Sequence, residues 1–171
     1  YLALEKLHII AHQELMRRAY SFTKGINEKD MNQWAERFFK TSVIPHLVHD
    51  MIANIKDHQK QGHTIILISE VIKPLARQFE RHFKAVEVAC TVIVRHNGTY
   101  TGNIKRLCTG EEKATQLCAM ATKHSLDLKK SYAYGDSAAD IPMMHLVRHK
   151  IAVSPKPELR HEALLHNWNI L

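Results

Sequence analysis

The chain has 171 residues, enough for one domain, or for a core with a small appendage, that buries a substantial interior. Apolar residues make up 45% of the sequence and charged residues 24%, as in ordinary globular proteins, and no apolar run is long enough to span a membrane. The formal net charge of +7 comes from scattered Lys and Arg without a basic block, so it favours general solvation, together with attraction to anionic small molecules, over nucleic-acid binding.

The cysteines and the first residue bear on where the protein works and on how much of it this chain represents. Cys90, Cys108 and Cys118 are odd in number and form no C-x-x-C pair, which argues against a disulfide framework and favours a reducing, cytoplasmic compartment. The chain opens at Tyr1 within a helical pattern, so we expect it to be the C-terminal portion of a longer parent protein.

Three helices are expected in the first third of the chain. Residues 2–24 predict an amphipathic helix closed by Gly25. A second helix is expected after Asn27, and a third over residues 42–60, closed by Gly62. The side chains expected on the buried faces of the second and third helices are Met31, Trp34 and Phe38, and Leu47, Met51 and Ile55.

Short apolar strands then alternate with helices. The continuous apolar run at 64–69 is typical of a strand covered on both faces, and Asn97-Gly98 predicts a hairpin turn. The other expected strands are 86–90, 131–134 and 150–153, and the expected helices are 71–83, 111–124, 141–147 and a short one near the end. This alternation predicts an α/β fold, an open parallel sheet with right-handed crossovers, from which the all-helical residues 1–42 stand apart.

Polar side chains gather at the predicted carboxyl ends of the strands, where open α/β sheets bind ligands. Ser69 ends one strand, and Asp136, Ser137 and Asp140 follow another. Lys113 falls in the first turn of the helix after CTGEE, so its ammonium could reach the same edge. A hydroxyl, an ammonium and two carboxylates predict a phosphate site with Mg²⁺, although each residue alone is as easily a turn, cap or surface residue.

The stretches GHTIILISE, GEEK, SYAYGDSAADIPMM, IAVSPKPELR and NWNIL, in this order, resemble the haloacid dehalogenase superfamily. The resemblance is to its phosphoserine-phosphatase-like branch, subfamily IB, which has a helical cap. Its second, third and fourth motifs correspond to Ser69, Lys113 and the Gly-Asp-x-x-x-Asp pattern at 135–140. The resemblance implies that residues 1–42 are the rear part of the cap and that residues 43–171 are the α/β core without its first strand.

The resemblance also implies a function, a Mg²⁺-dependent phosphomonoesterase that acts on a small phosphorylated metabolite through an aspartyl-phosphate. By this resemblance, Asp136 is a direct ligand of the metal. Asp140 contacts the metal only through a water molecule or supports another ligand. Ser69 and Lys113 hold the phosphoryl oxygens, and Glu70 and Ser137 are further candidates for binding the substrate. The hairpin at Asn97-Gly98 would be a flap that covers the substrate together with the cap.

Two departures from the family pattern stand out. The first motif, Asp-x-Asp-x-Thr, which carries the nucleophile, is absent from the sequence. We therefore expect an upstream segment to supply the nucleophile, on a strand between those that end at Ser69 and Tyr134, and the 171 residues alone to be inactive. Ala139 stands where phosphoserine phosphatases usually carry Asn, which makes another ester, such as histidinol phosphate, a competitor.

Other interpretations are a non-catalytic module that binds phosphorylated ligands and, ranked last, a nucleic-acid binder whose affinity falls steeply with salt. Thirteen histidines also suggest zinc sites, at His8 with His12 and at His46, His49 and Asp50. Neither group has the pattern of a known zinc motif, so we favour surface or half-buried histidines.

Overall fold

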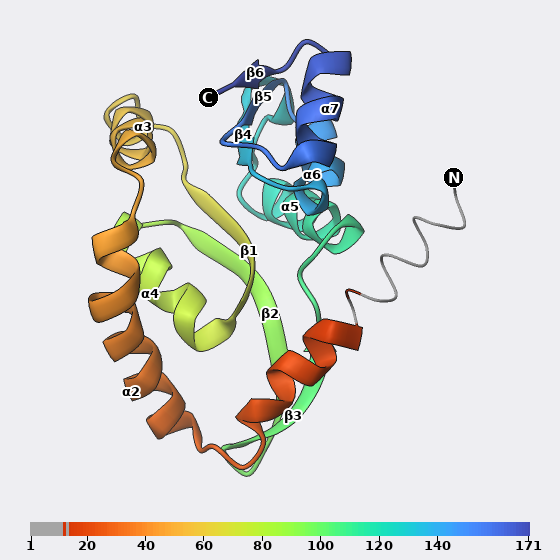
Figure 1. Cartoon of the computed structure of the whole chain (residues 1–171). Helices are drawn as coiled ribbons and strands as arrows, with labels where there is room; N and C mark the ends of the chain where they lie inside the picture. Colours follow the sequence, from red (N-terminus) through yellow and green to blue (C-terminus); the bar gives the residue numbers. More distant parts are fainter. Residues whose placement is uncertain (1–11, 13) are drawn as a thin grey trace. The chain divides into compact units, whose positions relative to one another are not determined.

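The computed structural model describes residue 12 and residues 14–171 (Figure 1). The chain divides into two compact units, a first that ends at Leu107 and a second, Cys108–Leu171, and each is described by itself. The predicted domain boundary between residues 42 and 43 is a different division and stays a prediction. None of the described helices is both long enough and apolar enough to cross a membrane.

The first unit is a three-stranded sheet with helices packed on it (Figure 1). Residues 14–20 are helical, in agreement with the predicted helix 2–24, of which residues 2–11 and 13 lie outside the described residues. The further elements are η1 (Ser21–Thr23), α2 (Glu28–Phe38), η2 (Phe39–Val43), η3 (Ile44–His46), α3 (His49–Lys60), β1 (Ile66–Ile72), α4 (Lys73–Phe83), β2 (Glu87–His96) and β3 (Thr99–Arg106).

Helix α2 begins where the sequence predicts it. The side chain of Asn27 accepts a hydrogen bond from the backbone N–H of Asp30 at 2.8 Å, which satisfies one of the unpaired donors of the first turn. Met31 is 1% exposed and packs with Ile72, Ile93 and Tyr100 in the core of this unit. The cap and the burial of Met31 confirm this helix and part of its predicted buried face.

The predicted burial of Trp34 and Phe38 is wrong. Their exposed fractions are 42% and 38%, and the buried stripe runs instead through Met31 and Ala35 of α2 to Phe39 at the start of η2. Trp34 and Phe38 lie beside this stripe, where their rings stack with centroids 5.3 Å apart. Each ring covers part of the other, so the pair lies on the surface without entering the core.

The predicted helix 42–60 is not continuous, because the range covers the end of η2, then η3 and α3. A π-helical turn and a 3₁₀ turn carry the chain to His46, and α3 begins only at His49. Pro45 stands in the first turn of η3, a position where proline is tolerated, and the break falls after it. Leu47 and Val48 are extended, which reorients the chain between the two helical segments.

The sheet of the first unit has the order β1-β2-β3, with β1 parallel to β2 and β2 antiparallel to β3. The hairpin prediction is confirmed, since Asn97 and Gly98 both have positive φ, as a two-residue turn of this kind requires. The strand expected at 86–90 and the first strand of the hairpin are one strand, β2. No Gly or Pro interrupts Glu87–His96, and the strand pairs first with β1 and then with β3.

The second unit is a parallel three-stranded sheet with the order β4-β5-β6. Figure 1 shows α5, α6 and α7 beside this sheet. Its elements are α5 (Glu111–Lys123), η4 (Leu128–Lys130), β4 (Tyr132–Gly135), η5 (Ala138–Asp140), α6 (Ile141–His145), β5 (His149–Ala152), α7 (Pro157–Leu165) and β6 (Asn169–Ile170). The sequence does not predict the short strand β6, because two residues are too few to show a periodicity.

The α/β class with parallel strands and connecting helices is confirmed, but the described strands form two sheets where one was expected. A parallel strand stands at one end of each sheet, β1 in the first and β4 in the second. Strand β1 itself contains Ser69 and Glu70, and β4 leads into the loop that carries Asp136, Ser137 and Asp140.

Candidate active site

The loop after β4 is built around a glycine that has no room for a side chain. A Cβ added at Gly135 would lie 2.6 Å from the Cβ of Asp140 and 2.8 Å from the Sδ of Met144. The φ of Gly135 is not positive, so the requirement is one of space and not of backbone conformation. The close approach allows the chain to turn from β4 into η5 with Asp140 folded back against the end of the strand.

Asp140 is buried, and both oxygens of its carboxylate are used. Oδ1 lies 2.6 Å from the Nζ of Lys113. Oδ2 accepts hydrogen bonds from the backbone N–H of Asp136 and from the N–H and Oγ of Ser137, at 3.1 to 3.2 Å. Burial alone would raise the pKa of this carboxyl group, but Lys113 and the two backbone donors outweigh it and hold the pKa below its usual value.

Lys113 reaches Asp140 from the first turn of α5. Lys113 is 8% exposed. Its backbone N–H donates a hydrogen bond to the carbonyl of Gly110 at 2.9 Å, which closes the first turn of the helix. The acidic Glu111 and Glu112 occupy the same first turn, where the helix dipole favours negative charge. The ammonium is thus fixed by one buried carboxylate.

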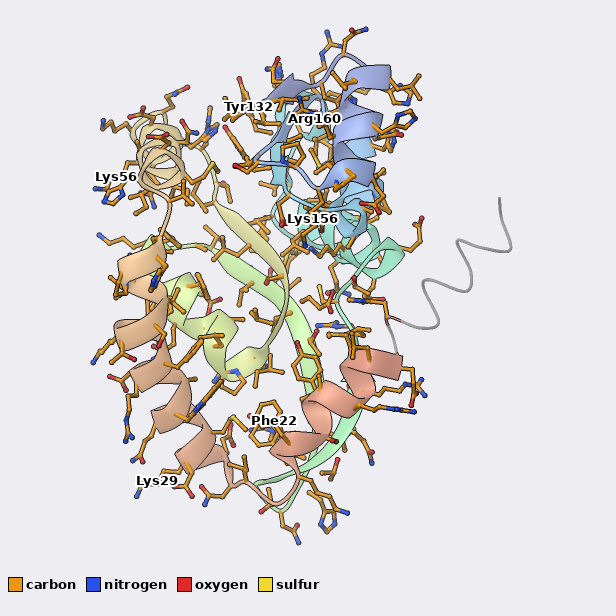
Figure 2. The ribbon with its side chains drawn as sticks, in the orientation of Figure 1. Phe22, Lys29, Lys56, Tyr132, Lys156 and Arg160 are labelled. Carbon is orange, nitrogen blue, oxygen red and sulfur yellow. The ribbon has the colours of Figure 1, made fainter. Side chains whose placement is uncertain are left out.

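Asp136 presents the accessible carboxylate of the loop. Its side chain is 65% exposed, and Oδ2 lies 3.8 Å from the Nζ of Lys156, which is labelled in Figure 2. The backbone of Lys156 also donates to the carbonyl of Asp136 at 2.8 Å, which connects this loop to the segment that leads into α7. Sequence reasoning missed Lys156, although it stands in the matched stretch IAVSPKPELR.

Of the two carboxylates in this loop, only that of Asp136 is placed to bind Mg²⁺ directly. Mg²⁺ prefers one or two carboxylates together with phosphate oxygens and water. The exposed Asp136 carboxylate suits that role, whereas the oxygens of Asp140 are engaged by Lys113, Ser137 and the loop backbone. The direct metal ligand predicted at Asp136 and the indirect role predicted for Asp140 stay predictions that this geometry supports.

Ser69 lies in an irregular part of β1. The parallel register with β2 runs as far as Ile68 and resumes at Ile72, so four steps along β1 match two steps along β2. Extra residues of this kind redirect side chains and are common next to active sites. The expected strand end at Ser69 therefore corresponds to the end of regular pairing, while β1 itself continues to Ile72.

Glu70 is held from three directions. Its backbone carbonyl accepts hydrogen bonds from Tyr20 Oη at 2.9 Å and from Thr91 Oγ1 at 2.5 Å. Its carboxylate lies 2.9 Å from the Nε2 of His12. Burial and the charge of Glu70 raise the pKa of Tyr20 to about 12, so its phenol keeps the proton that it donates. This segment of the first unit is fixed in conformation.

The structure therefore brings Lys113, Ser137 and Asp140 into contact and holds Asp136 through its backbone. Ser69 and Glu70 belong to the first unit, and their role toward the same phosphoryl group stays a prediction. Of the histidine hypotheses, His8 lies outside the described residues and His12 contacts Glu70. The Nδ1 of His46 lies 2.9 Å from the carbonyl oxygen of Ser42, within its own turn.

Comparison with known proteins identifies the family. A model of haloacid dehalogenase-like hydrolases matches residues 1–145. An "Inhibition of morphological differentiation protein" of Streptomyces azureus is 29% identical over 167 residues, covering 94% of this chain and 59% of that protein. A "Probable phosphatase" of Mycobacterium tuberculosis is 29% identical over 143 residues, covering 76% of this chain and 48% of the other. The chain thus spans about half the length of these curated relatives.

Solved structures share the fold. A protein of unknown function from Bordetella pertussis Tohama I matches with a TM-score of 0.81 at 23% identity, over 91% of this chain and 73% of that one. A probable phosphoserine phosphatase from Vibrio cholerae matches with a TM-score of 0.71 at 17% identity, over 91% of this chain and 45% of the other. These similarities place the chain among phosphoserine-phosphatase-like folds, as the ordered motifs predict.

Proposed function

Because the chain belongs to the haloacid dehalogenase-like hydrolase family, we propose that it is part of a Mg²⁺-dependent phosphatase acting on a small phosphate ester. The observation that carries the proposal is the buried pair of Lys113 and Asp140. Asp140 accepts hydrogen bonds from the loop that presents the exposed carboxylate of Asp136. One buried carboxylate thus orients both a cation and an accessible metal ligand.

In this proposal, the burial and contacts of each residue determine its role. Asp136 would hold Mg²⁺, which would offset the negative charge of the phosphoryl group. Lys113, fixed by Asp140, would place its ammonium toward a phosphoryl oxygen, and Ser69 would donate a hydrogen bond to another. Asp140 would act as a positioning residue, through the N–H groups of Asp136 and Ser137.

The reaction proposed is transfer of the phosphoryl group to an aspartate and then to water, releasing first the alcohol and then inorganic phosphate. The sequence contains no Asp-x-Asp stretch, so in this proposal the nucleophile lies outside the 171 residues. Among the described strands, β1 and β4 each stand at the end of their own sheet, where a further strand could pair. The absence of Asp-x-Asp equally favours the second candidate function, a non-catalytic module that binds phosphorylated ligands.

Phosphate release from a panel of small esters tests the proposal and separates the two functions. The panel includes phosphoserine and histidinol phosphate, and the whole gene product is assayed beside the 171-residue chain, with Mg²⁺ or with chelator. We expect turnover by the gene product with Mg²⁺ alone and none by the chain. Ester binding without turnover by the gene product would favour the binding module. Turnover by the 171 residues would place a nucleophile among them and refute the proposed mechanism.

A further inference from the structure

Three potential metal ligands meet at the C-terminal ends of two helices in the second unit. They are His145, the last residue of α6, Glu162 on α7, and His166, which follows the last residue of α7. One ligand atom from each lies within 4.8 Å of the others. The Nε2 of His145 is 2.8 Å from the Oε1 of Glu162, and the Nε2 of His166 is 3.1 Å from the same oxygen.

The local structure holds these side chains in place. The N–H of His166 donates to the carbonyl of Glu162 at 3.1 Å, so helical geometry continues to His166 and puts the two residues on one face. The ring of Trp168 stacks on His166, with centroids 6.1 Å apart, and meets the edge of His145 at 5.0 Å. The indole therefore restrains both imidazoles in orientations that direct them to Glu162.

The donor set matches a borderline transition metal. Zn²⁺ binds imidazole nitrogen and carboxylate oxygen at about 2.0–2.2 Å, so a tetrahedral ion separates its ligand atoms by roughly 3.3–3.5 Å. The separations in the cluster, from 2.8 Å to at most 4.8 Å, bracket that value, so binding requires small side-chain shifts only. Both histidine side chains are nearly half exposed, which leaves access to water at a fourth position.

Charge also favours a cation here. The C-terminal end of α7 carries the partial negative charge of unpaired carbonyls, and Glu162 contributes a full negative charge close by. Without a metal, the Nε2 atoms of both histidines contact the Glu162 carboxylate on the surface, an arrangement that contributes little to stability. A metal ion would take the same nitrogen and oxygen atoms as ligands, so its binding would replace these contacts.

We infer that His145, Glu162 and His166 form a binding site for a divalent transition-metal ion of the Zn²⁺ type. The site is distinct from the Asp136 loop in ligand type, because imidazole nitrogen suits Zn²⁺ whereas Mg²⁺ selects oxygen. An ion there would join the end of α6 to α7. Since α6 begins directly after Asp140, the ion would stabilise the helix that follows the candidate active-site loop.

Trp168 provides a local readout. The sequence contains two tryptophans, so a Trp34→Phe background, which changes an exposed side chain, leaves Trp168 as the only indole. Co²⁺ bound beside this ring should quench its fluorescence. We expect saturable quenching with one Co²⁺ per chain in the presence of excess Mg²⁺, reversal by chelator, and competition by Zn²⁺.

Single variants assign the site. His145→Ala, Glu162→Gln and His166→Ala should each weaken Co²⁺ binding at least tenfold. Each variant removes one proposed ligand, and even the loss of a residue that only supports a ligand typically lowers metal affinity by about 10- to 100-fold. His161→Ala is the matched control, because His161 is exposed on the same helix and lies outside the cluster. Far-UV circular dichroism verifies that each variant is folded, and each is compared with its own metal-free fluorescence.

Two results would overturn the inference. The first is the absence of saturable quenching up to millimolar Co²⁺. The second is quenching of equal affinity in His145→Ala and His166→Ala, which would assign the metal to other histidines of the chain. Neither result depends on phosphatase activity, so the inference and the proposed function are tested separately.

Discussion

The Nζ of Lys113 and the Oδ1 of Asp140 lie 2.6 Å apart, and both side chains are more than nine-tenths buried. They come from the first turn of α5 and the end of η5, 27 residues apart in the chain. Taking two charges out of water is costly, and the attraction between them repays this cost only while both are present. The pair therefore makes the loop after β4 sensitive to the loss of either partner.

Lys113→Met should destabilise the protein by about 3–5 kcal/mol, because it leaves the Asp140 carboxylate buried without its counter-charge. Urea unfolding at neutral pH measures the loss. Lys129→Met is the matched control, since Lys129 is exposed in the same unit, and we expect a change of less than about 0.5 kcal/mol. Equal stability of the two variants would show that the buried pair does not support the fold.

The lowered pKa of Asp140 predicts how stability depends on pH. A carboxyl group whose pKa is lower in the folded than in the unfolded state stabilises the fold above the unfolded value, about 3.9, and loses this contribution as the pH falls through the folded value. The difference in unfolding free energy between the wild type and Asp140→Asn should therefore be largest at neutral pH and shrink below about pH 4. A difference that stays constant down to pH 2 would contradict the assignment.

Gly135→Ala should destabilise the second unit by about 1–3 kcal/mol, the usual cost of adding a methyl group to a filled site. The added Cβ would meet the Cβ of Asp140 and the Sδ of Met144 at under 3 Å, and the first of these atoms belongs to the buried ion pair. Thermal unfolding measures the effect. The double variant Gly135→Ala/Met144→Ala relieves only the contact with Met144, so it should remain less stable than Met144→Ala alone.

The two faces of α2 should respond differently to truncation. Met31→Ala removes a fully buried side chain from the core of the first unit and should cost about 2–5 kcal/mol. Trp34→Ala removes a larger side chain from the surface, and we expect a loss below about 1 kcal/mol, mostly of stacking on Phe38. If urea unfolding showed a greater loss of stability for Trp34→Ala than for Met31→Ala, Trp34 would lie on the buried face of α2, as predicted from the sequence.

Features set by local chemistry were predictable. Asn27 caps α2 through a contact three residues away, and Asn97-Gly98 makes the hairpin because only a few residues tolerate positive φ at both positions. The Gly-Asp-x-x-x-Asp pattern is also local, so it places Asp136 and Asp140 correctly in one loop. Short sequence spacing leaves few alternatives to each of these structures.

Features set by packing across the chain were not predictable. Which of Trp34 and Ala35 faces the core depends on where α4 and the sheet lie, and the helical period alone permits either. The joining of residues 87–96 into one strand depends on partners on both sides of β2. For the proposed metal site, the sequence contains one indication, the spacing of four residues between Glu162 and His166. His145 reaches these two residues only through the packing of α6 and α7.

The most direct test of the account is Mg²⁺-dependent phosphate release by the gene product that contains this chain, with Asp136→Asn compared against the wild type. Asp127→Asn is the matched control, because Asp127 is an exposed carboxylate of the same unit and its cap at η4 can be made by Asn as well. The account predicts that Asp136→Asn remains folded and loses roughly 100-fold or more of its turnover, while Asp127→Asn retains it. Normal turnover in folded Asp136→Asn would contradict the assignment of Asp136 as the metal ligand, and with it the proposed site.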